Sequence, residues 1–125
     1  MKIPENLFYT KEHEWISKKN NVVKVGITDF AQSQLGDIIF LELPEVGDQI
    51  AAGESFGEIE AVKTVSELYA PIDGTILEVN EDLEDSPDNI NQDCYGKGWI
   101  IKVSYDGDFE SNRLLDHKAY SNLIE

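Results

Sequence analysis

Short apolar runs recur along the chain, and turn residues separate them at the intervals typical of an all-β domain. The runs that predict strands are residues 22–25, 38–43, 56–62, 65–69, 74–79 and 99–103. Gly26 and the segments 44–48 and 71–74 combine Pro, Gly and Asp in the manner of tight turns. The pattern therefore predicts several short antiparallel strands rather than alternating strands and helices.

Two stretches predict helices instead. Residues 28–35 start at a candidate N-cap, Thr28, and are followed by Gly36 in the position of a C-terminal glycine. Residues 111–124 have capping candidates in Ser111 and Asp116, and their apolar side consists of Leu114, Leu115, Tyr120, Leu123 and Ile124. No Pro-, Ala- or Ser-rich linker follows either stretch. We therefore expect one domain over residues 1–125, with a C-terminal helical segment at about 111–124.

The charge of the chain narrows the classes of partner. With 25 acidic against 10 basic residues, the formal net charge is −15. Nucleic acids and anionic membrane surfaces would be repelled, whereas partners with basic patches would be attracted in a salt-dependent manner. The first residues form neither an apolar signal segment nor an Arg- and Ser-rich transit segment. We expect a monomeric, cytoplasmic protein of bacterial type.

The residues that most often bind metals or act as nucleophiles are sparse. Cys94 is the only cysteine, which predicts a buried or inert thiol. His13 and His117 are too far apart in sequence for a metal-ligand motif, and His13 is assigned to a structural or docking strand. The acidic run at residues 80–88 lacks the glycine and the terminal glutamate of a calcium loop. These observations argue against a zinc site, a calcium site or a Cys-His nucleophile.

Lys63 lies between two of the predicted strands, 56–62 and 65–69. A lysine at the tip of a tight hairpin projects its amine into solvent, where a modifying enzyme can reach it. The same position also suits an ordinary solvated lysine. Spacing alone leaves both interpretations open.

Six blocks that together span most of the chain have a distinctive order and composition. They are residues 9–15 (YTKEHEW), 25–31 (VGITDFA), 35–44 (LGDIIFLELP), 60–64 (EAVKT), 70–74 (APIDG) and 91–99 (NQDCYGKGW). Through these blocks the sequence resembles the H protein of the glycine cleavage system over nearly the whole chain. Two positions depart from the family's pattern, because Ala61 replaces the usual Ser and Cys94 the usual Pro. Neither departure affects Lys63.

The resemblance implies a fold and a cofactor. The implied fold is a hammerhead, a barrel-sandwich hybrid of two small antiparallel sheets with short flanking helices. Lys63 would carry covalently attached lipoate, as N6-lipoyllysine, at a hairpin tip. A biotin carrier would have methionines on both sides of the lysine, and this chain has Val62 and Thr64. The Asp-Lys-Ala motif and flexible linkers of 2-oxoacid dehydrogenase lipoyl domains are also missing.

The resemblance further implies a carrier without catalysis of its own. Its partners would be a pyridoxal-phosphate-dependent glycine decarboxylase, a tetrahydrofolate-dependent aminomethyltransferase, dihydrolipoyl dehydrogenase and a lipoate-attaching enzyme. The carrier would take the aminomethyl group of glycine from the first to the second and deliver electrons to the third. Two alternatives remain from the sequence: a carrier that relays lipoate to other enzymes, and an unmodified hammerhead module that only binds partners.

Five further residues acquire candidate roles from the resemblance. Glu60 and Gly74 match positions that lipoate-attaching enzymes read, although Glu60 also suits a solvated strand and Gly74 a turn. Glu14, Glu67 and, on a weaker match, Glu12 are candidates for a cleft that shelters the charged arm, because an ammonium removed from water needs an anionic partner. In so acidic a chain, each glutamate also suits a plain solvated surface.

Overall fold

Two antiparallel sheets make up most of the protein in a computed structural model that describes residues 1–105 and 114–125. The strands of the larger sheet are, in spatial order, β1 (Phe8–Tyr9), β2 (Glu14–Lys19), β3 (Val22–Ile27), β9 (Ile101–Ser104), β8 (Gly74–Val79) and β5 (Gln49–Ile50). The smaller sheet has the order β4 (Ile38–Glu42), β6 (Ser55–Ala61) and β7 (Val65–Tyr69). The predicted fold of two small antiparallel sheets is confirmed, and neither sheet closes into a barrel within the described residues.

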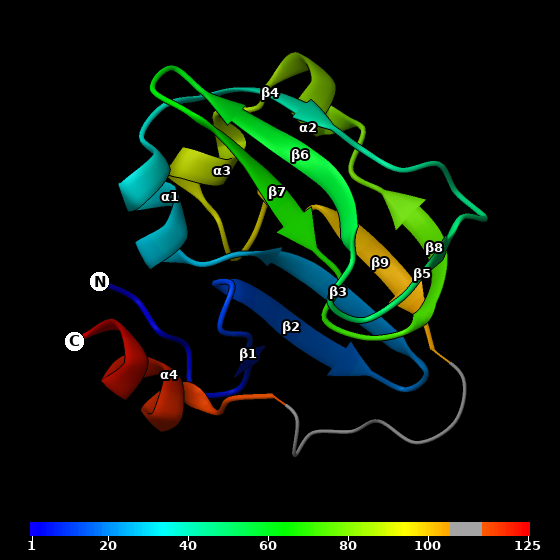
Figure 1. The fold of residues 1–125 in the computed structure, drawn as a ribbon, viewed down its shortest axis with the longest axis horizontal. Coiled ribbons are helices and arrows are strands. Elements are labelled where there is room, and N and C mark those ends of the chain that lie inside the picture. The colour runs from blue at the N-terminus through cyan, green and yellow to red at the C-terminus, as the bar shows by residue number, and fades with distance from the viewer. Residues whose placement is uncertain (106–113) are drawn as a thin grey trace.

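The two sheets share one apolar core. Strand alternation turns Val23 and Val25 of β3 inward, and it does the same for Ile59 of β6 and Leu68 of β7. Figure 1 shows β6 and β7, in green, lying across the strands of the larger sheet. The opposite side of β6 and β7 is exposed, and the hairpin between them is therefore anchored through one face only.

Within the described residues, four short helices lie at the edges: α1 (Asp29–Leu35), α2 (Asp82–Asp85), α3 (Asn89–Gln92) and α4 (His117–Ile124). The caps predicted for the first helix are confirmed. The Thr28 hydroxyl accepts a hydrogen bond from the Ala31 N–H, and Gly36 has a positive φ of 79°. None of the helices in the described ranges is long and apolar enough to cross a membrane.

The second predicted helix begins later than residue 111. Asp116 is its N-cap and accepts from the Ala119 N–H, so α4 starts at His117. Leu115 is extended instead, because its N–H and C=O both pair with Tyr9. Ser111 lies outside the described residues. The predicted boundary was wrong for Leu114 and Leu115, which belong to an extended segment beside β1 (Figure 1).

Aromatic side chains connect α4 to the rest of the protein. Tyr120 stacks on Tyr9 with ring centroids 4.7 Å apart. Its hydroxyl lies 2.7 Å from Thr28 Oγ1 and 2.9 Å from His13 Nδ1. His13 lies in the turn before β2 with a φ of 68°, so its assignment to a strand was wrong. These contacts join α4, the start of α1 and the turn before β2 into one unit.

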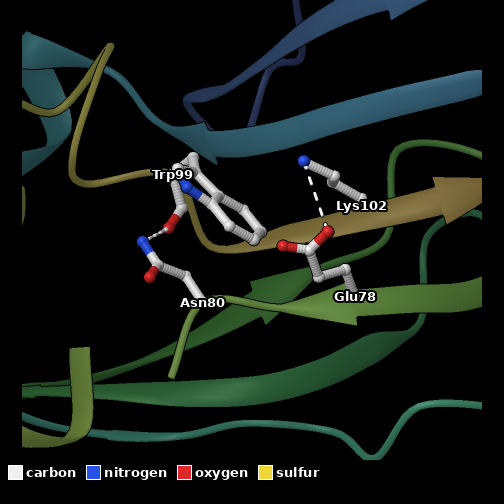
Figure 2. Close-up of polar contacts among 4 residues, drawn as sticks. All are labelled: Glu78, Asn80, Trp99 and Lys102. Atoms are coloured by element: carbon white, nitrogen blue, oxygen red, sulfur yellow. Dashed lines mark hydrogen bonds and ion pairs between the residues drawn. The ribbon is translucent and has the colours of Figure 1, made fainter. Parts of the chain in front are cut away.

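A buried amide organises the segment between β8 and β9. Figure 2 shows Asn80 beside Trp99, whose carbonyl accepts from the Asn80 amide at 2.7 Å. The same amide nitrogen donates to Lys97 O at 2.9 Å. Lys102 lies over the Trp99 ring, with Nζ 5.0 Å from the centroid and 3.3 Å from Glu78 Oε1. The loop that precedes β9 is thereby held against the end of β8.

Cys94 is buried and free. Burial raises the pKa of its thiol to about 12, so the reactive thiolate is scarce at neutral pH. Its carbonyl accepts from the Trp15 indole N–H at 3.0 Å. The prediction of a buried or inert thiol agrees with this environment.

Candidate functional site

Lys63 is an exposed residue of the turn between β6 and β7. The Ala61 N–H donates to Thr64 O at 2.8 Å, which closes the chain reversal. The flanking strands contain no glycine or proline near the turn, and their pairing of Glu60 with Val65 continues to its edge. The predicted hairpin tip is therefore present, with the lysine amine accessible to solvent.

The tip rests on the segment that follows α1. The Val62 N–H donates to Asp37 O at 3.0 Å, and a Cβ placed on Gly36 would lie 4.0 Å from Lys63 Cε. Figure 1 shows the hairpin turn close to the segment between α1 and β4. The aliphatic part of the Lys63 side chain therefore lies beside the C-terminal end of α1.

Asn91 supports this arrangement from α3. Its side-chain oxygen accepts from the Ile38 N–H at 2.9 Å, and its amide donates to Gly36 O at 2.8 Å and to Gln32 Oε1 at 3.1 Å. No local sequence pattern predicts this role for Asn91. The only sign of its importance in the sequence is its place in block 91–99, which carries the family resemblance. Side-chain hydrogen bonds between distant segments leave no periodic pattern in a sequence.

A cavity of about 230 Å³ lies between α1, β7 and the start of β2. It is lined by Glu12, His13, Glu14, Ile27, Phe30, Ala31, Gln34, Leu35, Ile59, Ser66, Glu67 and Leu68. All three glutamates predicted for a sheltering cleft are thus brought together. Leu35 is the last residue of α1 and directly precedes Gly36, so one helix connects the surroundings of Lys63 with the cavity.

Glu14 is the most unusual side chain of this cavity, because only 2% of its surface is exposed. The Thr10 hydroxyl donates to its Oε1 at 2.7 Å, and the Tyr69 N–H donates to Oε2 at 3.4 Å. Burial nevertheless raises the pKa of Glu14 to about 8, since no cation compensates for the lost solvent. Glu14 is therefore largely protonated near neutral pH when the cavity holds no cationic group.

Glu67 and Glu12 are exposed, unlike Glu14. Glu67 Oε2 accepts from the Tyr69 hydroxyl at 3.1 Å, and this hydrogen bond raises the pKa of Tyr69. Burial lowers the pKa of His13, so the neighbouring imidazole is predominantly neutral at pH 7. The cavity thus combines apolar walls, one buried carboxyl group and two carboxylates at its rim.

Comparison with known proteins identifies the family. A family model described as "Glycine cleavage H-protein" matches residues 7–125. The glycine cleavage system H protein of Bacillus licheniformis is 54% identical over 125 residues, which cover 100% of this chain and 98% of that protein. The H protein of Carboxydothermus hydrogenoformans is 52% identical over 123 residues, which cover 98% of this chain and 95% of that protein. The chain belongs to the glycine cleavage H-protein family.

A solved structure of another family member agrees with the fold. The crystal structure of a glycine cleavage system H protein from Mycobacterium marinum superposes with a TM-score of 0.90 at 43% sequence identity. The match covers 98% of each chain. Membership of the H-protein family confirms the predicted role as the lipoyl carrier of the glycine cleavage system. H proteins are carrier components that interact with the other components of the system, and they are not catalysts.

The two residues predicted for recognition lie at opposite ends of the β6–β7 hairpin. Glu60 is three residues before Lys63 on β6, partly exposed and paired with Val65. Gly74 is the first residue of β8. It follows Tyr69, the end of β7 that lies away from Lys63. A Cβ on Gly74 would collide with Ser104 O of β9, so close strand packing alone accounts for a glycine. Recognition of Gly74 stays a prediction.

The described residues contain no group of three or more His, Cys, Asp or Glu side chains that could hold a metal ion. His13 is hydrogen-bonded to Tyr120, and His117 begins α4. The acidic run at residues 80–88 contains α2 and leads into α3.

Proposed function

We propose that Lys63 is the lipoyl attachment site and is present as N6-lipoyllysine in the working carrier. The observation that carries this proposal is the position of its side chain, exposed at a hairpin tip and adjacent to the end of the helix that lines the cavity. An attaching enzyme needs access to the amine. A mobile arm also needs a nearby surface on which it can rest.

The cavity suits a small, largely apolar group. Its volume of about 230 Å³ is below the roughly 300–1,000 Å³ of pockets that enclose drug-sized ligands. Ile27, Leu35 and Leu68 supply apolar wall, whereas the carboxyl groups lie on the side of β2 and β7. A lipoyl group attached to Lys63 supplies a disulfide for group transfer and redox chemistry. The arm extends on the order of a dozen ångströms, as follows from ordinary bond lengths.

Within this proposal, Glu14 receives the cationic aminomethyl group that the carrier transports. An ammonium in the cavity favours the ionised form of Glu14 and forms a charge-assisted hydrogen bond with it. Glu67 and Glu12 act from the rim, where solvent weakens their contribution. The chain's own residues thus bind and orient the loaded arm and exclude water from it.

The proposed partners are glycine decarboxylase, aminomethyltransferase and dihydrolipoyl dehydrogenase, with a lipoate-attaching enzyme acting before them. We expect the carrier to act as a monomer, because one chain supplies both the attachment lysine and the cavity. Its net charge of −15 favours partners with basic docking surfaces. We expect these encounters to take place in the cytoplasm.

Mass spectrometry tests the attachment site. The chain incubated with a lipoate ligase, lipoate and ATP should gain one lipoyl group on Lys63. Lys63→Arg should gain none, whereas the control Lys19→Arg should be modified like the parent, because Lys19 is exposed at the end of β2. Modification of another lysine, or of none in a folded sample, would contradict the proposal.

A further inference from the structure

Exposed apolar side chains gather around the tip that carries Lys63. Of the eight large hydrophobic residues that are exposed within the described ranges, four belong to the tip or to the adjacent β4: Ile39, Phe40, Val62 and Val65. Phe40 is 56% exposed and Val65 is 55% exposed. Soluble proteins tolerate single exposed hydrophobic residues, but a group of them beside a modification site indicates contact with a partner.

Strand register places Phe40 and Val65 in one row, with Glu60 between them. Phe40 pairs with Glu60, and Glu60 pairs with Val65, so the row crosses β4, β6 and β7 on the face directed away from the core. Directly opposed Cβ atoms lie roughly 5 Å apart in antiparallel sheets. A register shift between Ile38 and Phe40 leaves Ile39 outside the regular pairing and exposed. Phe40, Glu60 and Val65, called here the tip row, therefore form a continuous strip.

The next row on the same face is entirely acidic. Glu42 pairs with Glu58, and Glu58 pairs with Glu67. Like charges in opposed positions destabilise a sheet. The ion pair between Lys102 and Glu78 lies in the other sheet, between β9 and β8. A partner that places basic side chains opposite this acidic row would relieve the repulsion.

The short reach of the unmodified lysine indicates which partner enzyme contacts these two rows. Before attachment, Nζ of Lys63 lies at most about 6 Å from its own Cα, judged from bond lengths. An enzyme that acylates this nitrogen must enclose the tip and contact the residues of β6 and β7 that lie next to the turn. Enzymes that act on the completed arm work on the order of a dozen ångströms from Lys63 and can dock elsewhere.

We propose that the tip row, with the acidic row behind it, is the docking surface for the lipoate-attaching enzyme. The complementary surface has an apolar strip for Phe40 and Val65, with Arg or Lys side chains opposite Glu60, Glu42 and Glu58. This inference rests on the proposed attachment at Lys63. It adds two apolar contacts, from Phe40 and Val65, to the recognition predicted above for Glu60 and Gly74.

The apolar part is tested with a lipoate ligase, lipoate and ATP, by following lipoyl transfer to the unmodified chain through intact mass. Phe40→Ser should lower kcat/KM about tenfold, a loss of about 1.4 kcal/mol, because the largest losses at interfaces fall on a few central anchor side chains. Val65→Thr keeps the side-chain shape and should lower kcat/KM about threefold. The loss should appear mainly in KM, since the lysine and the donor are unchanged.

Matched controls come from exposed hydrophobic residues elsewhere. Val46 is 66% exposed and Leu77 is 46% exposed, and neither belongs to the three-stranded sheet. Val46→Thr and Leu77→Ser should therefore retain the parent's kcat/KM within about twofold. Thermal unfolding of every variant establishes that the compared chains are folded.

The charged part is tested by varying salt. The double variant Glu42→Gln/Glu58→Gln should bind the ligase several-fold more weakly at low salt, with a flatter dependence of kcat/KM on ionic strength. Its control, Glu81→Gln/Glu84→Gln, removes the same charge from exposed positions at α2. An equal effect of both double variants would show that only net charge matters, and would overturn the role of the acidic row.

The outcomes separate this inference from the attachment site. If the parent is not modified on Lys63, the attachment proposal fails. If the parent is modified and Phe40→Ser and Val65→Thr match it, attachment stands and the tip row is not the docking surface. If these variants are lipoylated normally but receive the aminomethyl group slowly from glycine decarboxylase, the occupant is the decarboxylase and the present assignment is wrong.

Discussion

The hairpin tip and the cavity meet opposite physical requirements within one small protein. Lys63 is exposed, and its turn is held mainly by the bonds from Ala61 to Thr64 and from Val62 to Asp37. Glu14 is buried and receives hydrogen bonds from Thr10 and Tyr69. Attachment requires access, whereas sheltering a cation requires a desolvated carboxyl group. Substitution at the tip should therefore change function alone, and substitution in the cavity should change function and stability together.

The largest expected effect concerns Glu14 and pH. Its pKa is about 8 in the folded chain, compared with an ordinary value of 4.5. At pH values between these two pKa values, Glu14 holds a proton in the folded chain and has released it in the unfolded chain. The free energy of unfolding of the parent therefore falls as the pH rises through this window. Glu14→Gln removes the titration. The free energy of unfolding of Glu14→Gln, relative to that of the parent, should increase by about 2–4 kcal/mol from pH 5 to pH 9, measured by urea unfolding.

Glu67→Gln is the matched control for this measurement, because Glu67 borders the same cavity but is exposed. Its stability relative to the parent should change by less than about 0.5 kcal/mol over the same range. If Glu14→Gln and Glu67→Gln show the same flat difference, burial of Glu14 does not govern the pH dependence.

The next effect concerns retention of the aminomethyl group. A charge-assisted hydrogen bond contributes about 1.5–3 kcal/mol, so Glu14→Gln should accelerate release from the isolated carrier by at most about a hundredfold. Glu67→Gln should accelerate it only a few-fold, because its carboxylate is exposed. Lipoylated carriers are loaded by the decarboxylase and separated from it, and formaldehyde release is followed per lipoylated chain. Equal rates in both variants and the parent would show that neither glutamate retains the aminomethyl group.

Most strands and both caps of α1 could be predicted because they leave local signals. β7 and β8 have the bounds expected from alternation and turn residues, and Thr28 and Gly36 cap α1 as predicted. β1 and β5 contain two residues each, too few for a period to be visible. β2 is buried at its start and exposed at its end, which conceals the alternation along it.

The exposed hairpin tip of the candidate site could be predicted from the sequence, whereas the burial of Glu14 in the cavity could not. Two apolar runs around Lys63 predict an exposed lysine by local rules. The burial of Glu14 depends on Thr10 and on Tyr69, which is 55 residues away. The helix boundary near residue 115 failed for the same reason, since pairing of Leu115 with Tyr9 overrides local helix propensity. Long-range contacts decide such features.

The smallest expected effect is on the stability of tip variants. Lys63→Arg keeps the charge and leaves the turn bonds in place, because these bonds involve only backbone groups of Ala61, Val62, Thr64 and Asp37. Its free energy of unfolding should stay within about 0.5 kcal/mol of the parent, as is usual for exposed positions. Urea unfolding of the parent, Lys63→Arg and Lys19→Arg at one pH measures this difference. A loss above about 1 kcal/mol confined to Lys63→Arg would show that packing of the lysine against Gly36 supports the fold. In that case access and stability would not be separable at the tip, and the contrast with the cavity would disappear.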